Sequence, residues 1–473
     1  MLNFADVIEA ITGVRVPGAS LIVSEASIDS RQAIPAGLFF ALPGERVDGH
    51  NYVEDAFKRG AHAAVVQRDL DSARPVLDLR QAPAATGFNL PEAPFLIRVD
   101  DSLAALQTVA RFWRSKQKVR VVGVTGSVGK STTKELIAEV LNQRYHTLKN
   151  QGNLNNEIGL PLTLLRLGPG HQRAVLEMGF YVPGEISFLC ELAQPAIGVV
   201  TNIGTVHAER AGSQEAIAQG KSELVQALPS APEGVAILNY DDPFVRPMAE
   251  KTRAQVFYYG LNPVADLWAD EIEGMGLEGI RCCLHYAGES IHLHVPMIGQ
   301  HSVHTVLRAA AVGLVEGLTW EEIVDGLQHS HSQLRLVAVH AECGALLLDD
   351  TYNASPESTL AALNLLSELD GRRIAVLGDM LELGQYEQAG HDLVGVRAAE
   401  VCSELVTVGE RGKLIAAAAL AAGMRQGAVT WLPTVPEAIE HLRQHLCKGD
   451  VVLVKGSHGM RMDRIVSALE VTA

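Results

Sequence analysis

The 473-residue chain has few basic residues for its length, and this shortage restricts its partners. It carries 39 Lys and Arg residues against 55 Asp and Glu residues, which gives a formal net charge of −16 at pH 7. A nucleic-acid backbone would be repelled by such a chain unless a strong basic patch offset the charge. We therefore expect no nucleic-acid partner, and an anionic substrate would need local cations such as a lysine and a metal ion.

Long apolar runs and paired cysteine motifs are also missing. No run reaches the roughly 18 apolar residues of a membrane span, and the N-terminus, MLNFADVIEAITGV, lacks the basic start of a signal peptide. The six cysteines are scattered without any C-x-x-C motif, as in proteins of a reducing compartment. We expect a cytoplasmic globular protein of about three domains, since domains average ~100–200 residues.

The most informative motif lies between Val119 and Leu141. An apolar, β-branched run predicts a buried strand, the turn T-G-S-V-G-K-S follows it, and a helical pattern begins at the lysine. Glycines let successive N–H groups point at one anion, and the helix N-terminus adds its positive dipole end. The strict phosphate-loop pattern requires glycine at position 124, where this chain has Val124, and Gly126 supplies the glycine instead.

This motif predicts a binding site for a nucleoside triphosphate. Lys130 supplies a cation for the terminal phosphates, and the Ser131 hydroxyl can ligate Mg²⁺. The predicted ATP-binding residues of the loop are Thr125, Gly126, Ser127, Val128, Gly129, Lys130, Ser131 and Thr132.

Hydrophobic patterning predicts an α/β protein with three domains. Residues 1–100 combine short strands, one of them at 21–23, with helices and a Pro- and Ala-rich loop at 74–94. An amphipathic helix leads into the phosphate-loop domain, residues 101–330, which includes antiparallel strands over 256–295. Residues 331–473 alternate strands and helices in a Rossmann-like pattern, without the G-x-G-x-x-G motif that a dinucleotide site would require.

Three ionisable residues lie downstream of the phosphate loop. Glu177 ends an apolar strand, where an ionised carboxylate is costly unless it is paired or binds a metal. It is either a Mg²⁺ ligand or a strand-end residue in solvent. His207 follows the next strand and could reach the same site, although such a histidine is usually a loop residue. Lys221 lies on a helix that begins near Ser213, where a lysine is ordinarily a solvated side chain.

Polar loops supply further candidates. Asn150, Asn153, Asn155 and Asn156 lie in one turn, which is either a polar loop or a recognition loop for a polar substrate. Polar residues also follow two apolar strands of the third domain, as in functional loops on a rigid scaffold. These residues are Asp349, Asp350, Tyr352, Asn353 and Lys455. The histidines between positions 285 and 331 lack a Cys–His zinc spacing, so surface strands are the favoured interpretation.

Taken together, these residues resemble the Mur ligase family, the ATP-dependent amide-forming enzymes of peptidoglycan synthesis. The resemblance covers almost the whole chain. It rests on D-S-R (29–31), T-G-S-V-G-K-S-T-T-K, G-N-L-N-N-E-I-G-L-P, L-E-M-G, T-N-I-G-T-V-H, D-D-T-Y-N-A-S-P, G-D-M-L-E-L-G and V-L-V-K-G-S. It implies an N-terminal domain for a UDP-linked substrate, a central P-loop ATPase domain and a C-terminal Rossmann-like ligase domain.

The resemblance also implies a reaction. The stretches are most similar to the family member that joins D-alanyl-D-alanine to UDP-N-acetylmuramoyl-tripeptide through an acyl phosphate. We expect the protein to be a monomer. Another Mur-family amino acid ligase or a folylpolyglutamate-type synthetase remains an alternative, as does an ATP-driven switch protein that forms no amide. The sequence does not identify the third amino acid of the peptide.

Residue roles follow from the resemblance position by position. Ser131 and Glu177 correspond to magnesium ligands, His207 to a ligand of a second Mg²⁺, and Lys221 to a lysine carried as a carbamate. Lys130, Lys221 and His207 are therefore the implied catalytic residues. Arg335 and Asp350 correspond to nucleotide contacts from the third domain. The implied substrate-binding residues are Ser30, Arg31, Asn153, Asn155, Asn156, Tyr352, Asn353 and Lys455.

One stretch departs from the family pattern. The family's G-x-H-N-x-x-N stretch usually ends in an asparagine that reads adenine, whereas this chain has Ser302 and Thr305 at the two asparagine positions. A hydroxyl cannot reproduce the paired donor and acceptor of a carboxamide. If Thr305 lies at the nucleotide, discrimination between ATP and GTP should therefore be weaker.

Overall fold

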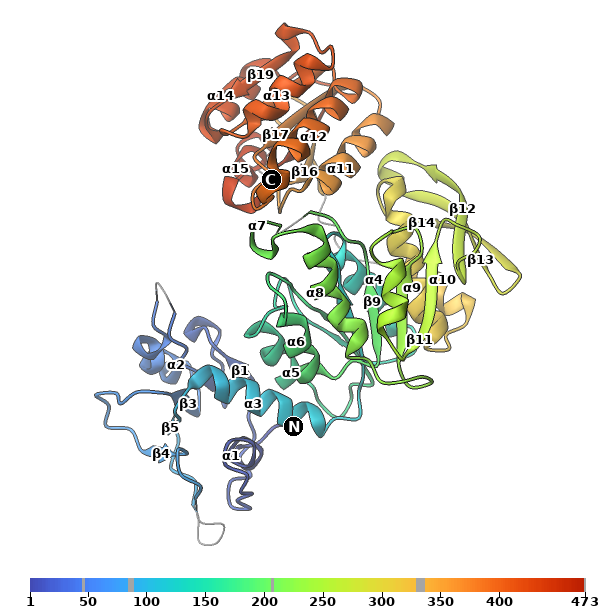
Figure 1. Cartoon of the computed structure of the whole chain (residues 1–473). Helices are drawn as coiled ribbons and strands as arrows, with labels where there is room; N and C mark the ends of the chain where they lie inside the picture. Colours follow the sequence, from blue (N-terminus) through green and yellow to red (C-terminus); the bar gives the residue numbers. More distant parts are fainter. Residues whose placement is uncertain (45–46, 84–88, 206–207, 329–336, 472–473) are drawn as a thin grey trace.

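Three β-sheets organise the chain, and helices cover each of them (Figure 1). The computed structural model describes residues 1–44, 47–83, 89–205, 208–328 and 337–471. The three sheets lie within residues 26–98, 120–295 and 337–455, and each is built mainly of parallel strands. The α/β class predicted from the sequence is confirmed.

The first sheet has the strand order β1-β2-β3-β5-β4, with parallel neighbours. Its strands are β1 (Ala26–Ser27), β2 (Leu38–Phe40), β3 (Ala63–Val66), β4 (Val76–Asp78) and β5 (Phe95–Arg98). Helices α1 (Phe4–Thr12) and α2 (Val53–Lys58) accompany them. The aromatic residues Phe4 and Phe95 meet in the core, with ring centroids 5.3 Å apart.

Two sequence predictions were wrong in this domain. Strand β4 lies inside the stretch predicted as a loop, because its single inward side chain, Leu77, gives almost no pattern. The predicted strand at 21–23 contributes only an isolated bridge between Ile22 and Asn3, and Leu21 is exposed. It therefore has no sheet neighbour among the described residues.

The central sheet has nine strands in the order β14-β13-β12-β11-β10-β9-β6-β8-β7. Its strands are β6 (Arg120–Thr125), β7 (Thr147–Lys149), β8 (Arg173–Glu177), β9 (Ile197–Val200), β10 (Val235–Asn239), β11 (Gln255–Gly260), β12 (Leu267–Gly274), β13 (Ile280–Tyr286) and β14 (Glu289–Val295). Strands β12, β13 and β14 are antiparallel, as predicted, but β11 pairs in parallel with β10 and β12, so the predicted antiparallel stretch begins too early.

Helices cover both faces of the central sheet, because its parallel strands are apolar on both sides. The helices within residues 101–330 are α3 (Ser102–Ser115), α4 (Lys130–Asn142), α5 (Gly159–Leu165), α6 (Glu185–Ala193), α7 (Ala208–Ala211), α8 (Gln214–Gln226), α9 (Val303–Val315) and α10 (Trp320–Gln328). Helix α4 buries Leu136, Ile137, Val140 and Leu141, the apolar positions of its sequence pattern.

The third sheet has the order β15-β16-β20-β17-β18-β19, and its parallel strands alternate with helices as the sequence predicted. Its strands are β15 (Val337–His340), β16 (Leu346–Asp350), β17 (Arg372–Gly378), β18 (Glu404–Val408), β19 (Val429–Leu432) and β20 (Asp450–Lys455). The helices are α11 (Pro356–Glu368), α12 (Glu387–Val401), α13 (Gly412–Ala421), α14 (Val435–His445) and α15 (Asp463–Leu469). The antiparallel edge strand β15 was not predicted.

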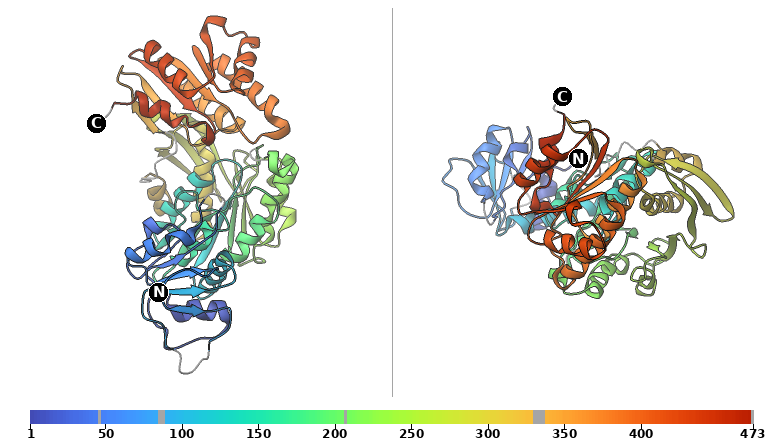
Figure 2. Two further views of the ribbon diagram at one scale, coloured as in Figure 1. Left: turned by 90° about the vertical axis from the view of Figure 1, so that its left-hand side faces the viewer. Right: turned by 90° about the horizontal axis from the view of Figure 1, so that it is seen from above.

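The N-terminal and third domains lie at opposite ends of the central domain (Figure 2). Helix α3 packs against α1 on one side and against α5 and α6 on the other. At the other end, Glu357 of α11 accepts a hydrogen bond from the Thr205 amide at 3.0 Å. The Glu209 amide also donates to the Glu382 carbonyl at 3.2 Å. None of the described helices has the length and apolar character needed to cross a membrane.

Candidate active site between the central and third domains

The phosphate loop joins β6 to α4 through two glycines with positive φ. Gly126 has φ +145°, and a Cβ on it would stand 1.8 Å from the Thr201 hydroxyl oxygen. Gly129 has φ +81° and directly precedes α4, so the amides of the first helical turn point into the loop. Both positions require glycine. The departure at Val124 is tolerated because Val124 lies in strand β6 rather than in the turn.

The end of strand β9 holds this loop in shape. The Ser127 amide donates to the Asn202 carbonyl, and the Val128 amide donates to the Asn202 side-chain oxygen, each at 2.9 Å. The Gly204 amide in turn donates to Ser127 Oγ at 2.9 Å. Lys130 Nζ donates back to the carbonyl oxygens of Gly126, at 2.8 Å, and Ser127, at 3.1 Å. The lysine ammonium therefore lies over the loop whose amides would hold a phosphate.

Ser131 and Glu177 bring two oxygen atoms together beside the loop. The Ser131 hydroxyl donates to Glu177 Oε2 at 2.6 Å, while the Asn155 amide nitrogen donates to Glu177 Oε1 at 2.8 Å. Hard oxygen ligands of this kind suit Mg²⁺, so the donor set fits the ion that the sequence resemblance implied. Glu177 is buried, which disfavours the solvent-exposed alternative for this residue.

Sequence reasoning missed Lys134, which lies near the same carboxylate. Its side chain is buried, and Nζ donates to the Asn150 carbonyl at 2.8 Å and lies 3.9 Å from Glu177 Oε2. Helical phase could have revealed it, because Lys134 shares the buried face of α4 with Ile137 and Leu141. Asn150 is also fully buried and pairs with the Glu177 backbone in both directions. It therefore positions the strand end.

Lys221 is buried, so the prediction of a solvated helical lysine is wrong. Only 1% of the residue is exposed, and its Nζ lies over the Phe180 ring, 4.9 Å from the centroid. Nζ donates to the Gly126 carbonyl at 2.9 Å, which places the lysine directly beneath the phosphate loop. Burial, with the nearby Lys130 charge as a second cause, holds the pKa of Lys221 well below its ordinary value. Its amine is therefore favoured in the neutral, nucleophilic form.

The third domain supplies the opposite wall of a cleft above the loop. Lys455 at the end of β20 donates to Asp350 at the end of β16 at 2.6 Å, and to the Asn353 carbonyl at 2.9 Å. The carboxyl ends of parallel strands are the usual position for ligands in such sheets. The cleft is lined by residues 127–132, Ile298, His301, Ser302 and Thr305 of the central domain and by Asp350, residues 352–355, Ser358, Ala361, Ala362, Leu365 and Lys455 of the third.

Thr305 lies on this cleft, and its hydroxyl accepts a 2.7 Å hydrogen bond from Arg308 Nη2. Arg308 is buried one helical turn further along α9, with its guanidinium carbon 5.8 Å from the Tyr259 ring centroid. Neither Arg308 nor Tyr259 was identified from the sequence. Burial lowers the pKa of His304 in this region to about 4, so its imidazole is neutral at physiological pH.

The structure brings some predicted substrate residues to the cleft and leaves others elsewhere. Tyr352, Asn353 and Lys455 line it. Asn155 contacts Glu177, but Asn153 is exposed, and the Asn156 side-chain oxygen accepts from the Gly159 amide at the start of α5. In the N-terminal domain, Ser30 is buried, while the Arg31 side chain is 82% exposed and pairs with Asp29 at 2.7 Å. His207 and Arg335 lie outside the described residues.

Comparison with known proteins covers all three domains. The model described as "Mur ligase family, catalytic domain" matches residues 22–114, "Mur ligase middle domain" matches 124–313, and "Mur ligase, glutamate ligase domain" matches 334–458. A Bacillus subtilis relative named UDP-N-acetylmuramoyl-tripeptide–D-alanyl-D-alanine ligase is 34% identical over 95% of this chain and 93% of its own. An Escherichia coli relative of the same name is 33% identical over 96% and 95%.

Solved structures agree with these relatives. The MurF crystal structure from Acinetobacter baumannii has a TM-score of 0.82 and 30% identity, covering 98% of this chain and 97% of its own. The Thermotoga maritima MurF ligase, solved in complex with ADP, has a TM-score of 0.78 and 25% identity over 95% and 97%. The chain belongs to the Mur ligase family, and its three domains have the arrangement found in this group of ATP-dependent amide ligases.

Proposed function

We propose that this protein is the cytoplasmic, ATP-dependent ligase that joins D-alanyl-D-alanine to UDP-N-acetylmuramoyl-tripeptide during peptidoglycan precursor synthesis. The observation that carries the proposal is the full-length similarity to relatives named for this reaction, which extends through all three domains. The cleft supports it, since a phosphate loop faces polar side chains of a second domain, as an ATP-driven condensation of two substrates requires.

The reaction has two bond-forming steps. A carboxylate oxygen of the tripeptide attacks the γ-phosphorus of ATP, the bond to the β-phosphate oxygen breaks, and ADP leaves. The amine of D-alanyl-D-alanine then attacks the acyl carbon, and the tetrahedral adduct collapses with loss of phosphate and of the amine proton. The first step brings two anions together, so it needs positive charge that is fixed in place before the substrates meet.

The residues of the loop supply that charge in our proposal. The amides of residues 125–132 and the ammonium of Lys130 hold the phosphates, while Asp350 and Lys455 close the cleft from the third domain and exclude water from the acyl phosphate. Ser131 and Glu177 would hold Mg²⁺, which neutralises phosphate charge when it is bound. We further propose that Thr305 and Arg335 contact ATP and that His207 holds a second Mg²⁺. The residues that we propose to contact the substrates are Ser30, Arg31, Asn153, Asn155, Asn156, Tyr352 and Asn353. We also propose that the domains comprise residues 1–100, 101–330 and 331–473 and that the protein is a monomer.

Lys221 has a chemical role in this proposal. An ammonium beside a metal site would repel the cation, whereas the neutral amine can attack CO₂, lose a proton and become an anionic carbamate. Burial of Lys221 lowers its pKa and so favours the neutral amine, and the contact between Nζ and the Gly126 carbonyl places it beneath the loop. We propose that Lys221 is carried as a carbamate, so that its negative charge favours cation binding at the site.

One reaction tests the function. The protein is incubated with ATP and UDP-N-acetylmuramoyl-tripeptide, with and without D-alanyl-D-alanine, and the products are identified by mass. The proposal expects ADP, phosphate and a product heavier than the tripeptide substrate by one dipeptide less one water, only when the dipeptide is present. An amide formed with a different amine acceptor would indicate a sister ligase. ADP release without any amide would instead indicate an ATP-driven switch.

A further inference from the structure

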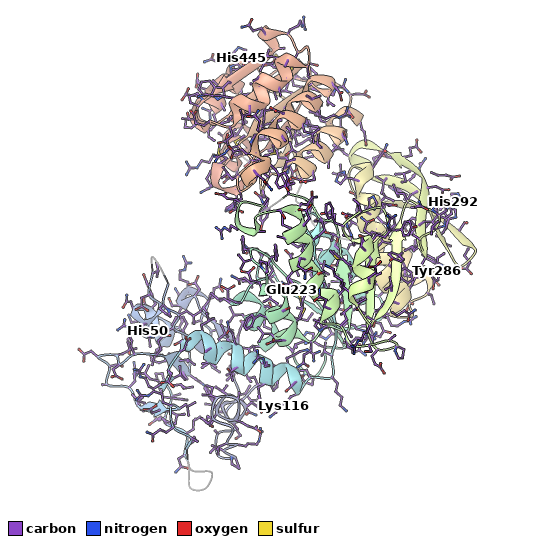
Figure 3. All side chains as sticks on the ribbon, in the orientation of Figure 1. His50, Lys116, Glu223, Tyr286, His292 and His445 are labelled. Carbon is purple, nitrogen blue, oxygen red and sulfur yellow. The ribbon has the colours of Figure 1, made fainter. Side chains whose placement is uncertain are left out.

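The antiparallel strands β12, β13 and β14 carry a group of metal-binding residue types that do not line the cleft. Asp270 on β12 lies directly opposite Cys283 on β13, and Cys283 lies directly opposite His292 on β14. Directly paired residues place their side chains on the same face of a sheet. His285 lies two residues beyond Cys283 and therefore shares that face. Figure 3 labels His292 on these antiparallel strands.

This face is not the core face of the sheet. The alternate residues Ala269, Cys282, Leu284 and Leu293 belong to the hydrophobic core beneath α9. The outer face would ordinarily carry polar residues in water, yet Cys283 is only 2% exposed because its cross-strand neighbours cover it. The Cys283 thiol lies among a carboxylate and two imidazoles on the solvent-facing side of the sheet. Together these groups can bind a metal ion, whereas residues on the other face pack in the hydrophobic core.

Asp270, Cys283 and His285 form a close group of ligand atoms, and His292 joins it through its contact with Cys283. Cys283 Sγ lies 3.8 Å from His292 Nδ1, and ligand atoms of Asp270, Cys283 and His285 all lie within 4.8 Å of one another. Ligands at the usual zinc distances of about 2.0–2.3 Å are separated by about 3.3–3.8 Å at tetrahedral angles. The Asp270–His285 contact, at 2.7 Å, must lengthen by about 0.6 Å to match the separation expected for an oxygen and a nitrogen ligand.

Two further features hold the imidazoles in place. The Trp268 ring stacks on His285 with centroids 3.9 Å apart, and Ser290 Oγ lies 2.8 Å from His285 Nδ1. On the other side, a register shift after Asp270 and a positive φ of +49° at Glu271 turn the Glu271 carboxylate towards His292 Nε2, 3.1 Å away. Bulges commonly re-aim a side chain in this way. A carboxylate on the second ring nitrogen is the usual partner of a metal-bound histidine.

We propose that Asp270, Cys283, His285 and His292 form a binding site for a borderline divalent transition-metal ion of the Zn²⁺ class, with Glu271 positioning His292. One thiolate and two imidazoles are ligands that such ions prefer and that Mg²⁺ does not, and a carboxylate completes the set for either kind of ion. On binding, the S–H bond of Cys283 breaks, a sulfur–metal bond forms and the proton passes to solvent. The bound ion fastens three neighbouring strands to one another, independently of the ligase reaction.

Cobalt(II) is the probe that tests the site. The full-length protein, with ADP and Mg²⁺ in excess to occupy the phosphate loop, is titrated anaerobically with Co²⁺. The proposal expects one ion per chain with tetrahedral ligand-field bands and a thiolate-to-cobalt charge-transfer band, all removed by Zn²⁺. Absence of the charge-transfer band in the unmodified protein would overturn the proposal, since Co²⁺ bound at an oxygen-lined phosphate site has no thiolate ligand.

Variants identify the ligands. Cys283→Ser should remove the charge-transfer band, and His292→Ala should weaken Co²⁺ binding by roughly tenfold or more. The His292 side chain is 71% exposed, so its loss does not threaten folding. His294→Ala, on the same strand but bonded to the Glu278 carbonyl at 2.8 Å, and Cys343→Ser, an exposed cysteine, are matched controls that should bind as the unmodified protein does. Unchanged affinity in His292→Ala, or a band that survives Cys283→Ser, would show that the group is not the site.

Stability provides a second measurement. Zn²⁺ should raise the Tm of the unmodified protein and of His294→Ala, because an ion that binds only the folded chain stabilises it. The same Zn²⁺ should leave the Tm of His292→Ala nearly unchanged. An equal rise in all three proteins would contradict the proposal.

Discussion

Ser131 Oγ and Glu177 Oε2 lie 2.6 Å apart, and their contact joins the first turn of α4 to the end of the neighbouring strand β8. Adjacent ligands of an octahedral Mg²⁺ at about 2.0–2.1 Å are about 2.9 Å from each other. The two oxygens thus need to separate by only about 0.3 Å to share one ion. Asn155, which donates to the other carboxylate oxygen, keeps Glu177 in this orientation.

Glu177→Gln should lower kcat by about 100-fold and raise the Mg²⁺ concentration needed for half-maximal activity, because one charged ligand becomes a neutral amide. The measurement is initial rate against Mg²⁺ concentration. Glu191→Gln is a matched control, since Glu191 is an exposed residue whose carboxylate pairs with Arg111. An unchanged Mg²⁺ dependence in Glu177→Gln would rule out Glu177 as a metal ligand.

Lys130→Ala should lower kcat for amide formation by about 100- to 1,000-fold while leaving the fold intact. The side chain bonds to loop carbonyls and does not belong to a hydrophobic core. Product formation at saturating ATP is measured together with the circular dichroism of the variant. Near-normal turnover would contradict the phosphate-loop assignment.

Removal of dissolved CO₂ should lower activity, and bicarbonate should restore it, if Lys221 carries a carbamate. Lys221→Arg should be at least about 100-fold less active, because arginine keeps its positive charge and forms no carbamate. Lys251→Arg, on the surface, is the control. If activity did not depend on CO₂ and the Lys221→Arg variant were active, the carbamate would be ruled out and Lys221 would have only a structural role.

Lys221 should also make stability depend on pH in CO₂-free, metal-free protein. The pKa of Lys221 is lowered in the folded state, so between that value and the ordinary value of 10.5 the unfolded chain binds more protons. The free energy of unfolding should therefore rise with pH from neutral to alkaline conditions, relative to Lys221→Met, which lacks the group. Urea unfolding of both proteins across this range measures the difference, and parallel curves would contradict the expectation.

Thr305→Asn should increase the preference for ATP over GTP by about 2- to 10-fold, the equivalent of one hydrogen bond worth about 0.5–1.5 kcal/mol. The carboxamide offers a donor and an acceptor at a position where the hydroxyl is already engaged by Arg308. The ratio of kcat/KM for the two nucleotides is compared in both proteins, and equal ratios would refute the prediction.

Gly126→Ala should lower the free energy of unfolding by more than about 1 kcal/mol and eliminate nucleotide binding, because the new Cβ overlaps the Thr201 hydroxyl. The Gly184→Ala variant separates the effect of the steric overlap from the effect of the positive φ. Gly184 also has a positive φ, +95°, but a Cβ there meets nothing within 4 Å. Equal destabilisation in the two variants would mean that the overlap with Thr201 is relieved by local movement.

Sequence reasoning worked where a local pattern carries the information. Strands β6 and β8 are apolar on both faces, and α4 repeats apolar residues at helical spacing, so each of these elements was predicted from its own stretch of sequence. Glu177 was recognised as a candidate for the same reason, since an apolar run that ends in a charged residue can be recognised from the sequence alone. Short elements such as β4 carry too few inward residues to be recognised.

Other features depend on contacts between distant segments. Lys221 packs against Phe180, and Gly126 is constrained by Thr201, and neither partner is adjacent in sequence. Cys283 and His292 face each other only because of the strand register, so their spacing in the chain resembles no zinc motif. The assignments of His207 and Arg335 remain predictions, since both lie outside the described residues.

The backbone at Gly204 and Thr205 has a mechanical consequence. The Thr205 amide is bonded to Glu357 of the third domain, and the preceding amide, of Gly204, is bonded to Ser127 of the phosphate loop. Two consecutive peptide groups cannot stretch, so they act as a short tether between α11 and the loop. As long as both hydrogen bonds persist, the position of Glu357 in the third domain and that of Ser127 in the phosphate loop are connected through these two peptide groups.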